Sequence, residues 1–212
     1  MWLRMAMSCT SDSMSDYYYF LLFKPFGYLS QFSREVPEHK VLGDLYHFPE
    51  DVYPVGRLDA DSEGLLILTN DKKLNAKLLS PEKGHWRTYL IQVEGNPMDA
   101  DLEKLRTGIH LTIRKKIHRC KPARVKLIKP PEVLPERDPP IRYRKNIADC
   151  WIEISLQEGK NRQERKMMAA IGFPVLRLVR ISIETLSLSK QIPGRVEQLQ
   201  GKEIYQKLKI QR

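Results

Sequence analysis

The sequence contains only three cysteines, Cys9, Cys120 and Cys150, in 212 residues. An odd number excludes a disulfide framework that pairs all of them, and no two stand at the spacing of a metal-binding pair. We therefore expect reduced thiols and no metal site. The chain is long enough to bury a core without such cross-links.

Long apolar runs and signal-like segments are also missing. The longest apolar stretch, residues 17–23, has the length of a strand and is far shorter than the roughly 18 residues that span a bilayer. Residues 1–16 have no apolar core of a secretion signal and are rich in serine, which favours a flexible N-terminal lead. We expect no membrane association and a cytoplasmic location.

Acidic residues are scarce in the second half of the chain. Residues 1–100 carry 10 Lys and Arg against 14 Asp and Glu, residues 101–212 carry 26 against 12, and the formal net charge is +10. A basic half favours a polyanionic partner. Nucleic acid fits better than a membrane because no long basic amphipathic helix is present. A solvated basic face is the alternative.

Hydrophobic periodicity and turn residues predict an α+β fold with a mixed, mostly antiparallel sheet and flanking helices. Strands are expected at residues 17–23, 64–69, 88–94, 150–156 and 175–183, and two more around a basic turn within 109–129. Helices are expected near residues 42–46, 74–79, 97–106, 161–171 and 202–209, and a loop at the proline-rich residues 130–140. Asn96 and Pro97 are typical of a helix start, and Gly172 of the residue after a helix end.

Residues 55–64 are the first segment that could carry chemistry. Asp59 and Asp61 stand between Gly56 and Gly64, directly before an apolar strand. This arrangement predicts a carboxylate held at the edge of a sheet. An ordinary acidic loop is the alternative, and a metal site lacks an obvious third ligand.

Four segments together resemble the RsuA-type branch of the pseudouridine synthases. They are FLLFKPFGYLSQF from Phe20, GRLDADSEGLLILTND from Gly56, RTYLIQVEG from Arg87 and EGKNRQERKMMAAIGFPVLRLVRISI from Glu158. Their order agrees with the family, and they extend over most of the chain. The resemblance implies the pseudouridine synthase fold, with two sub-domains around a central cleft.

The resemblance also implies a domain organisation. Residues 17–212 would form the catalytic domain and residues 1–16 its lead. The S4-type RNA-binding domain that begins many members has no counterpart here, so the chain is most similar to the large-subunit members that are a catalytic domain alone. The basic, proline-rich region at about residues 114–145 would then take on more of the RNA binding. We expect a monomer.

The implied reaction is site-specific isomerisation of uridine to pseudouridine in ribosomal RNA, with the 23S RNA of the large subunit as the expected substrate. The N1–C1′ bond breaks and a C5–C1′ bond forms, without a cofactor or a metal. A carboxylate must lie against the ribose–base junction, and Asp59 matches the family aspartate. Attack at C6, attack at C1′ and proton removal at C2′ all stay open.

Other residues match the family site. Arg165 matches the arginine that pairs with the aspartate, where it would keep the carboxylate charged and aimed. Tyr89 matches the tyrosine whose ring packs on the uracil and whose hydroxyl assists a late proton transfer. Leu176 and Leu178 would line the pocket, although core packing explains both equally well.

The target nucleotide must leave its stack to reach the carboxylate, and basic side chains would supply the binding free energy. Arg57 points the same way as Asp59 in extended backbone and would fill the gap left by the nucleotide. The other candidates are Arg87, Arg114, Lys115, Lys116, Arg119, Arg142, Arg144, Lys145, Lys160, Arg162 and Lys166. Two alternatives stay open: a non-catalytic RNA-binding or ribosome assembly protein with this fold, and action on transfer RNA.

Overall fold

The computed structural model describes residues 17–141 and 148–211. Its strands are β1 (Tyr19–Lys24), β2 (Tyr53–Pro54), β3 (Glu63–Thr69), β4 (Arg87–Glu94), β5 (His110–Ile113), β6 (Lys116–Arg119), β7 (Arg124–Ile128), β8 (Asp149–Leu156), β9 (Val175–Ile183), β10 (Leu186–Ser187) and β11 (Val196–Gln198). Its helices are α1 (Lys72–Leu79), α2 (Asp99–Arg106), α3 (Gln163–Ala170) and α4 (Gly201–Lys207), with a short 3-10 turn, η1 (Leu42–Asp44).

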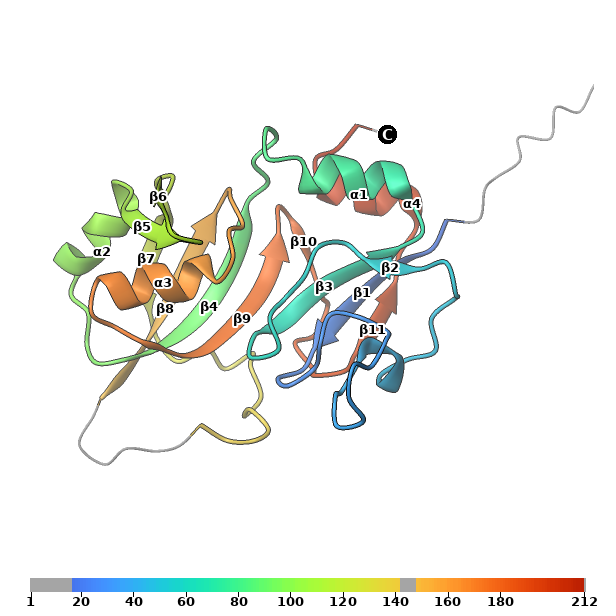
Figure 1. Cartoon of the computed structure of the whole chain (residues 1–212), viewed down its shortest axis with the longest axis horizontal. Helices are drawn as coiled ribbons and strands as arrows, with labels where there is room; N and C mark the ends of the chain where they lie inside the picture. Colours follow the sequence, from blue (N-terminus) through green and yellow to red (C-terminus); the bar gives the residue numbers. More distant parts are fainter. Residues whose placement is uncertain (1–16, 142–147, 212) are drawn as a thin grey trace, which may run out of the picture.

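In the described part of the chain, nine strands form one sheet in the order β11-β1-β3-β9-β4-β8-β7, with β2 added to β3 and β10 to β9 (Figure 1). The strands β5 and β6 form a separate hairpin. Among the described strands only β3 and β9 pair in parallel. The expected α+β class with a mixed, mostly antiparallel sheet is confirmed.

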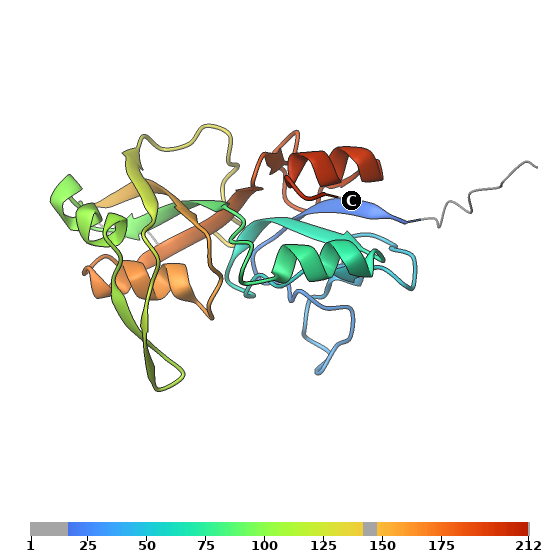
Figure 2. The same cartoon turned by 90° about the horizontal axis from the view of Figure 1, so that it is seen from above.

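The core is divided between two halves of this sheet. In one half α1 and α4 pack on β1 and β3, through a cluster that includes Leu74 and Ile204. In the other half α2 and α3 pack on β4, β7 and β8, through a cluster that includes Leu102 and Met167. The views from the front and from above show the two halves side by side (Figures 1 and 2).

Both β1 and β3 are buried along their whole length. Their second face is covered by Leu42, Phe48 and Val52 from the segment between the two strands. A strand covered on both faces carries a continuous apolar run instead of an alternating one. This explains why both strands can be recognised in the sequence from apolar runs.

The two halves meet where β3 and β9 run side by side, with Gly64 opposite Arg180. Gly64 has a φ of +101°, and a Cβ atom there would lie 2.2 Å from the Arg180 carbonyl oxygen. Only glycine permits this backbone conformation and this close approach. The joint between the halves therefore depends on a residue of the same motif that carries Asp59.

The β5–β6 hairpin projects away from the sheet (Figure 2). Its turn residues, Arg114 and Lys115, have φ angles of +49° and +64°, as a type I′ turn requires. At its base the Glu158 carboxylate lies 3.0 Å from His118 Nε2 and accepts a hydrogen bond from the Lys121 amide at 2.8 Å. The hairpin is thus attached at its base to the loop that precedes α3.

Two details of the sequence-based prediction were wrong. The helix α2 begins at Asp99, two residues later than expected, with Met98 as its N-cap and with the Met98 amide donating to the Asp101 carboxylate at 3.0 Å. This capping contact satisfies the helix end, so Pro97 stays outside the helix. The basic region forms three strands, β5, β6 and β7, where two were expected.

The expected N-terminal lead, residues 1–16, lies outside the described residues. Within the described part of the chain, no helix has the length and apolar character needed to cross a bilayer.

Candidate active site

A cleft of about 580 Å³ opens between the two halves of the sheet. The loop before β3 forms one wall, and β4, β9 and the start of α3 form the other. Eight of the residues expected in the site line it: Arg57, Asp59, Arg87, Tyr89, Arg114, Lys160, Arg162 and Leu178. Segments far apart in the sequence therefore meet in one cavity, as the resemblance implies.

The loop that carries Asp59 is fixed by hydrogen bonds on both sides of it. The Ser30 hydroxyl donates to the Leu58 carbonyl at 2.7 Å and accepts from the Leu58 amide at 3.0 Å. The Gly27 amide donates to the Ala60 carbonyl at 2.7 Å. These contacts hold the backbone of the loop on both sides of Asp59.

Lys24 lies beneath this loop and is fully buried. Its Nζ donates to the carbonyls of Tyr28 at 2.7 Å and Pro25 at 2.9 Å and lies 3.5 Å from that of Ala60. Burial lowers the pKa of Lys24 to about 7, although the charges of Glu63 and Asp61 act in the opposite direction. The lysine therefore ties together the turn after β1 and the loop of Asp59.

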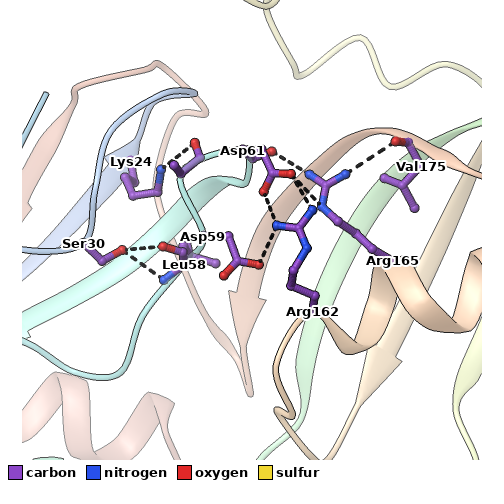
Figure 3. Close-up of polar contacts among 9 residues, drawn as sticks. Lys24, Ser30, Leu58, Asp59, Asp61, Arg162, Arg165 and Val175 are labelled. Carbon is purple, nitrogen blue, oxygen red and sulfur yellow. Dashed lines mark hydrogen bonds and ion pairs between the residues drawn. The ribbon is translucent and has the colours of Figure 1, made fainter. Parts of the chain in front are cut away.

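The arginine nearest to Asp59 differs from the one expected. Arg162 Nη1 lies 3.5 Å from Asp59 Oδ2, and both nitrogens of the same guanidinium bind Asp61, at 3.0 and 2.7 Å (Figure 3). Arg165 instead donates to the Asp61 carbonyl at 2.6 Å and the Val175 carbonyl at 3.4 Å. Its Nε lies 3.4 Å from the Asp61 carboxylate.

The direct contacts of Arg165 are thus with Asp61 and Val175, while the Asp59 charge acts on its guanidinium at longer range. The helix α3 begins just after Arg162, and Arg165 lies about one turn further along the same face. The first of the two arginines thus reaches the cleft, whereas the second lies behind Asp61.

The Asp61 carboxyl has a lower pKa than an ordinary aspartate. Burial acts to raise the pKa of its carboxyl, but the hydrogen bond from Arg162 and the charge of Arg165 outweigh this and hold the pKa below its usual range. Asp61 therefore presents a permanent negative charge to both arginines.

Buried polar side chains line the cleft, among them Tyr89, Glu164 and Arg180. Burial raises the pKa of the Tyr89 hydroxyl, and the nearby Glu164 charge raises it further. Burial likewise raises the pKa of Glu164, against the opposing effects of Tyr89 and Arg180. Tyr89 is therefore neutral at physiological pH and has a second carboxyl group beside it.

The remaining basic candidates are spread around the cleft. Arg87 is engaged by the carbonyls of His85 and Leu78, both at 3.2 Å. Arg57, Arg114, Lys160 and Arg162 are exposed at the cleft. Lys115, Lys116 and Arg119 lie exposed on the hairpin, and Lys166 is partly buried on α3. Arg142, Arg144 and Lys145 lie outside the described residues.

Leu176 does not line the cleft, contrary to the prediction for a pocket wall. Its side chain is half-buried, and its carbonyl lies 3.4 Å from Arg137 Nη1. Tyr89 pairs with Arg180 on the neighbouring strand, and Leu176 is four residues from Arg180, about 13 Å along an extended strand. Leu178 is only half as far away and does reach the cavity.

Sequence reasoning did not identify Lys24, Ser30, Glu164 and Arg180. Arg180 alternates with Leu178 on β9, so the two-residue period of a strand predicts that it shares the cleft-facing side. The other three have no such signal, because their places depend on contacts between distant segments.

A cluster of metal-ligating side chains lies beside the hairpin. His118, Cys120 and Glu158 offer ligand atoms within 4.8 Å of one another. The Glu158 carboxylate, however, also accepts hydrogen bonds from Lys121 at 2.8 Å and Gln163 at 2.6 Å. Its Oε1 is therefore occupied by contacts that attach the hairpin to α3, and its Oε2 lies 3.0 Å from His118.

This cleft and fold define a class of protein. The family model described as "RNA pseudouridylate synthase" matches residues 18–170, and the chain belongs to that family. It is accordingly an enzyme of the type that isomerises uridine to pseudouridine in RNA.

Curated relatives narrow the class further. The chain is 47% identical over 177 residues to "Ribosomal large subunit pseudouridine synthase E" of Vibrio parahaemolyticus, covering 84% of this chain and 71% of the relative. It is 46% identical over 174 residues to the protein of the same name from Xanthomonas axonopodis pv. citri, covering 82% and 89%. "Ribosomal large subunit pseudouridine synthase B" of Bacillus subtilis is 35% identical, with 88% and 69% covered.

A solved structure gives the same fold. The structure titled "Crystal structure of pseudouridylate synthase" superposes with a TM-score of 0.73 at 24% identity, over 91% of this chain and 74% of the other. The expected pseudouridine synthase fold is thus confirmed.

Proposed function

We propose that this protein converts a specific uridine of large-subunit ribosomal RNA to pseudouridine, with Asp59 as the carboxylate that acts at the ribose–base junction. The observation that carries the proposal is the position of Asp59 in the cleft. Its carboxylate is 38% exposed on a fixed loop, and Tyr89 lines the same cavity. A substrate nucleotide can thus reach a charged carboxylate and an aromatic ring together.

The roles of the other residues follow from their surroundings. The flipped base stacks on Tyr89, whose raised pKa keeps the hydroxyl protonated until late in the reaction. Arg57, Lys160 and Arg162 are exposed around Asp59 and bind the phosphates beside the flipped nucleotide. The hairpin with Arg114, Lys115 and Lys116 extends this basic surface along the RNA.

The chemistry uses groups that the chain itself supplies. The N1–C1′ bond breaks, a C5–C1′ bond forms, and the C5 hydrogen leaves as a proton while N1 gains one, so the reaction consumes no oxidant or reductant. We propose that the protein acts as a monomer in the cytoplasm, where its ribosomal RNA substrate is found.

The substrate is tested by mapping pseudouridine in RNA after incubation with the purified protein. Large-subunit RNA, small-subunit RNA and transfer RNA are treated in parallel, and carbodiimide adducts are located as stops of reverse transcription. We expect one new stop, confined to large-subunit RNA. A new stop confined to transfer RNA would overturn the assignment of substrate, and RNA binding without any new stop would favour a non-catalytic role.

A further inference from the structure

Arginine binds Asp61 more strongly than it binds Asp59, two residues earlier. Two arginines contact Asp61 from the start of α3 (Figure 3). Arg162 binds both of its carboxylate oxygens, at 3.0 and 2.7 Å. Arg165 binds its main-chain carbonyl at 2.6 Å and approaches its carboxylate at 3.4 Å.

The two arginines differ in how firmly they are held. The Arg165 side chain is 14% exposed and is also tied to the Val175 carbonyl. The Arg162 side chain is 42% exposed, and the described residues offer it only Asp59 and Asp61 as charged partners. Arg162 can thus change partners without disturbing the core, whereas Arg165 cannot.

Asp59 and Asp61 compete for Arg162. The contact with Asp61 is bidentate, whereas the contact with Asp59 is a single approach at 3.5 Å. Bidentate pairing is the stronger arrangement for arginine. The Arg162 backbone also has a φ of +51°, in the left-handed region that non-glycine residues adopt only when their surroundings hold them there.

We propose that Asp61 is a positioning residue that holds Arg162 at the cleft mouth, bound through two hydrogen bonds to Asp61 and through only a single 3.5 Å contact to Asp59, and yields it to an RNA phosphate when substrate enters. The inference rests on the proposed function, because an RNA phosphodiester is the incoming partner. A phosphate offers arginine the same two-oxygen pairing as a carboxylate. Asp61 therefore limits the contact of Arg162 with the Asp59 carboxylate in the free protein and keeps the phosphate-binding group in place.

Asp61→Asn is expected to raise the affinity for RNA and to lower kcat. Without the Asp61 carboxylate, Arg162 is free to bind RNA and also free to form a closer ion pair with Asp59. We expect single-stranded RNA to bind about twofold to fivefold more tightly, as the loss of one partly exposed ion pair implies, while kcat falls. A residue needed only for folding would weaken both properties together.

The affinity is measured with a fluorescein-labelled oligouridylate on full-length protein that carries Asp59→Asn, so that no reaction occurs. Asp61→Asn is compared alone and combined with Arg162→Gln. We expect the gain in affinity to disappear in the Arg162→Gln background and to persist in an Arg165→Gln background. Glu50→Gln removes an exposed acid outside the cleft and controls for net charge.

A second measurement needs no RNA and separates this proposal from the proposed function. In ¹⁵N-labelled protein the bidentate contact restrains rotation of the Arg162 guanidinium, and Asp61→Asn releases it. Equal gains in affinity with and without Arg162, weaker RNA binding by Asp61→Asn, or unrestrained Arg162 in the parent protein would each overturn the proposal. Failure of the parent protein to form pseudouridine, with these results intact, would overturn the proposed function instead.

Discussion

Glu63 and Arg177 form a buried, bidentate ion pair between β3 and β9, with both contacts at 2.8 Å. Their side chains are 3% and 5% exposed. Arg177 also donates to the Pro135 carbonyl at 2.8 Å, so the pair fastens the proline-rich loop to the joint between the two halves of the sheet. The cleft lies at this joint, and its shape therefore depends on the pair.

Removing one charge of this pair is expected to destabilise the protein strongly. Glu63→Gln leaves Arg177 buried without its anionic partner, which costs about 3–5 kcal/mol. The exposed pair of Glu203 and Lys207, also at 2.8 Å, provides the control, because Glu203→Gln is expected to cost less than about 1 kcal/mol. Urea denaturation measures both, and equal effects would contradict this account of the joint.

The close approach of β3 and β9 also requires glycine at position 64. Gly64→Ala places a Cβ atom 2.2 Å from the Arg180 carbonyl oxygen, at a φ of +101°. We expect a loss of stability of about 3 kcal/mol or more, or failure to fold. Gly43→Ala is the matched control, since its Cβ would meet only a ring carbon of Phe32 at 3.9 Å. A thermal midpoint for Gly64→Ala equal to that of the control would contradict the close packing of β3 on β9.

The buried carboxyl of Glu164 gives a pH-dependent prediction. Its pKa in the folded protein is raised above its ordinary value near 4.5. At pH 4 the Glu164 carboxyl is largely protonated in both the folded and the unfolded state, so burying it costs little free energy. As the pH rises through the raised pKa, the folded state must hold a buried charge and loses stability relative to the unfolded state.

Glu164→Gln removes this titration while keeping the side-chain size. We expect the variant to be more stable than the parent at pH 8 and nearly equal to it at pH 4. Urea midpoints at the two pH values test this. A variant destabilised at pH 8, or changed equally at both values, would show that the carboxylate is well compensated in the folded state.

The basic surface predicts a strong dependence of RNA affinity on salt. The logarithm of the association constant for single-stranded RNA should fall by about 0.7 per phosphate contacted for each tenfold increase in salt. Lys115→Glu with Lys116→Glu, on the exposed hairpin, should lower both the affinity and this slope. Lys72→Glu with Lys73→Glu reverses two exposed lysines of α1 outside the cleft and should change neither. A slope unaffected by the hairpin change would exclude this surface from RNA binding.

Much of the fold could be predicted from local patterns. The apolar runs of β1 and β3 and the alternation of β4 and β9 mark strands, and Gly172 marks the end of α3. The start of α2 was predicted wrongly, because Asn96 and Pro97 are typical of a helix start and compete with the local capping of the Met98 amide by Asp101. Local signals compete at such positions, and contacts decide among them.

In the site, too, some features could be predicted from the sequence and others depend on contacts made only in the folded chain. Residues 56–60, the GRLDA segment, and Tyr89 could be assigned to one cleft by resemblance. The partner of each arginine could not, since Arg162 and Arg165 are one helical turn apart and either spacing is compatible with Asp59. The buried neighbours Glu164 and Lys24 acquire their surroundings from strands that meet only in the folded chain.

Tritium release shows whether Asp59 performs the isomerisation. Pseudouridine has the same mass as uridine, but the C5 hydrogen leaves the base during the reaction. Large-subunit RNA labelled with tritium at uridine C5 is incubated with the parent protein and with Asp59→Asn, which keeps the shape of the side chain and removes its charge. We expect tritium release by the parent protein alone, with RNA binding retained in both proteins. Full release by Asp59→Asn would contradict the catalytic role of Asp59.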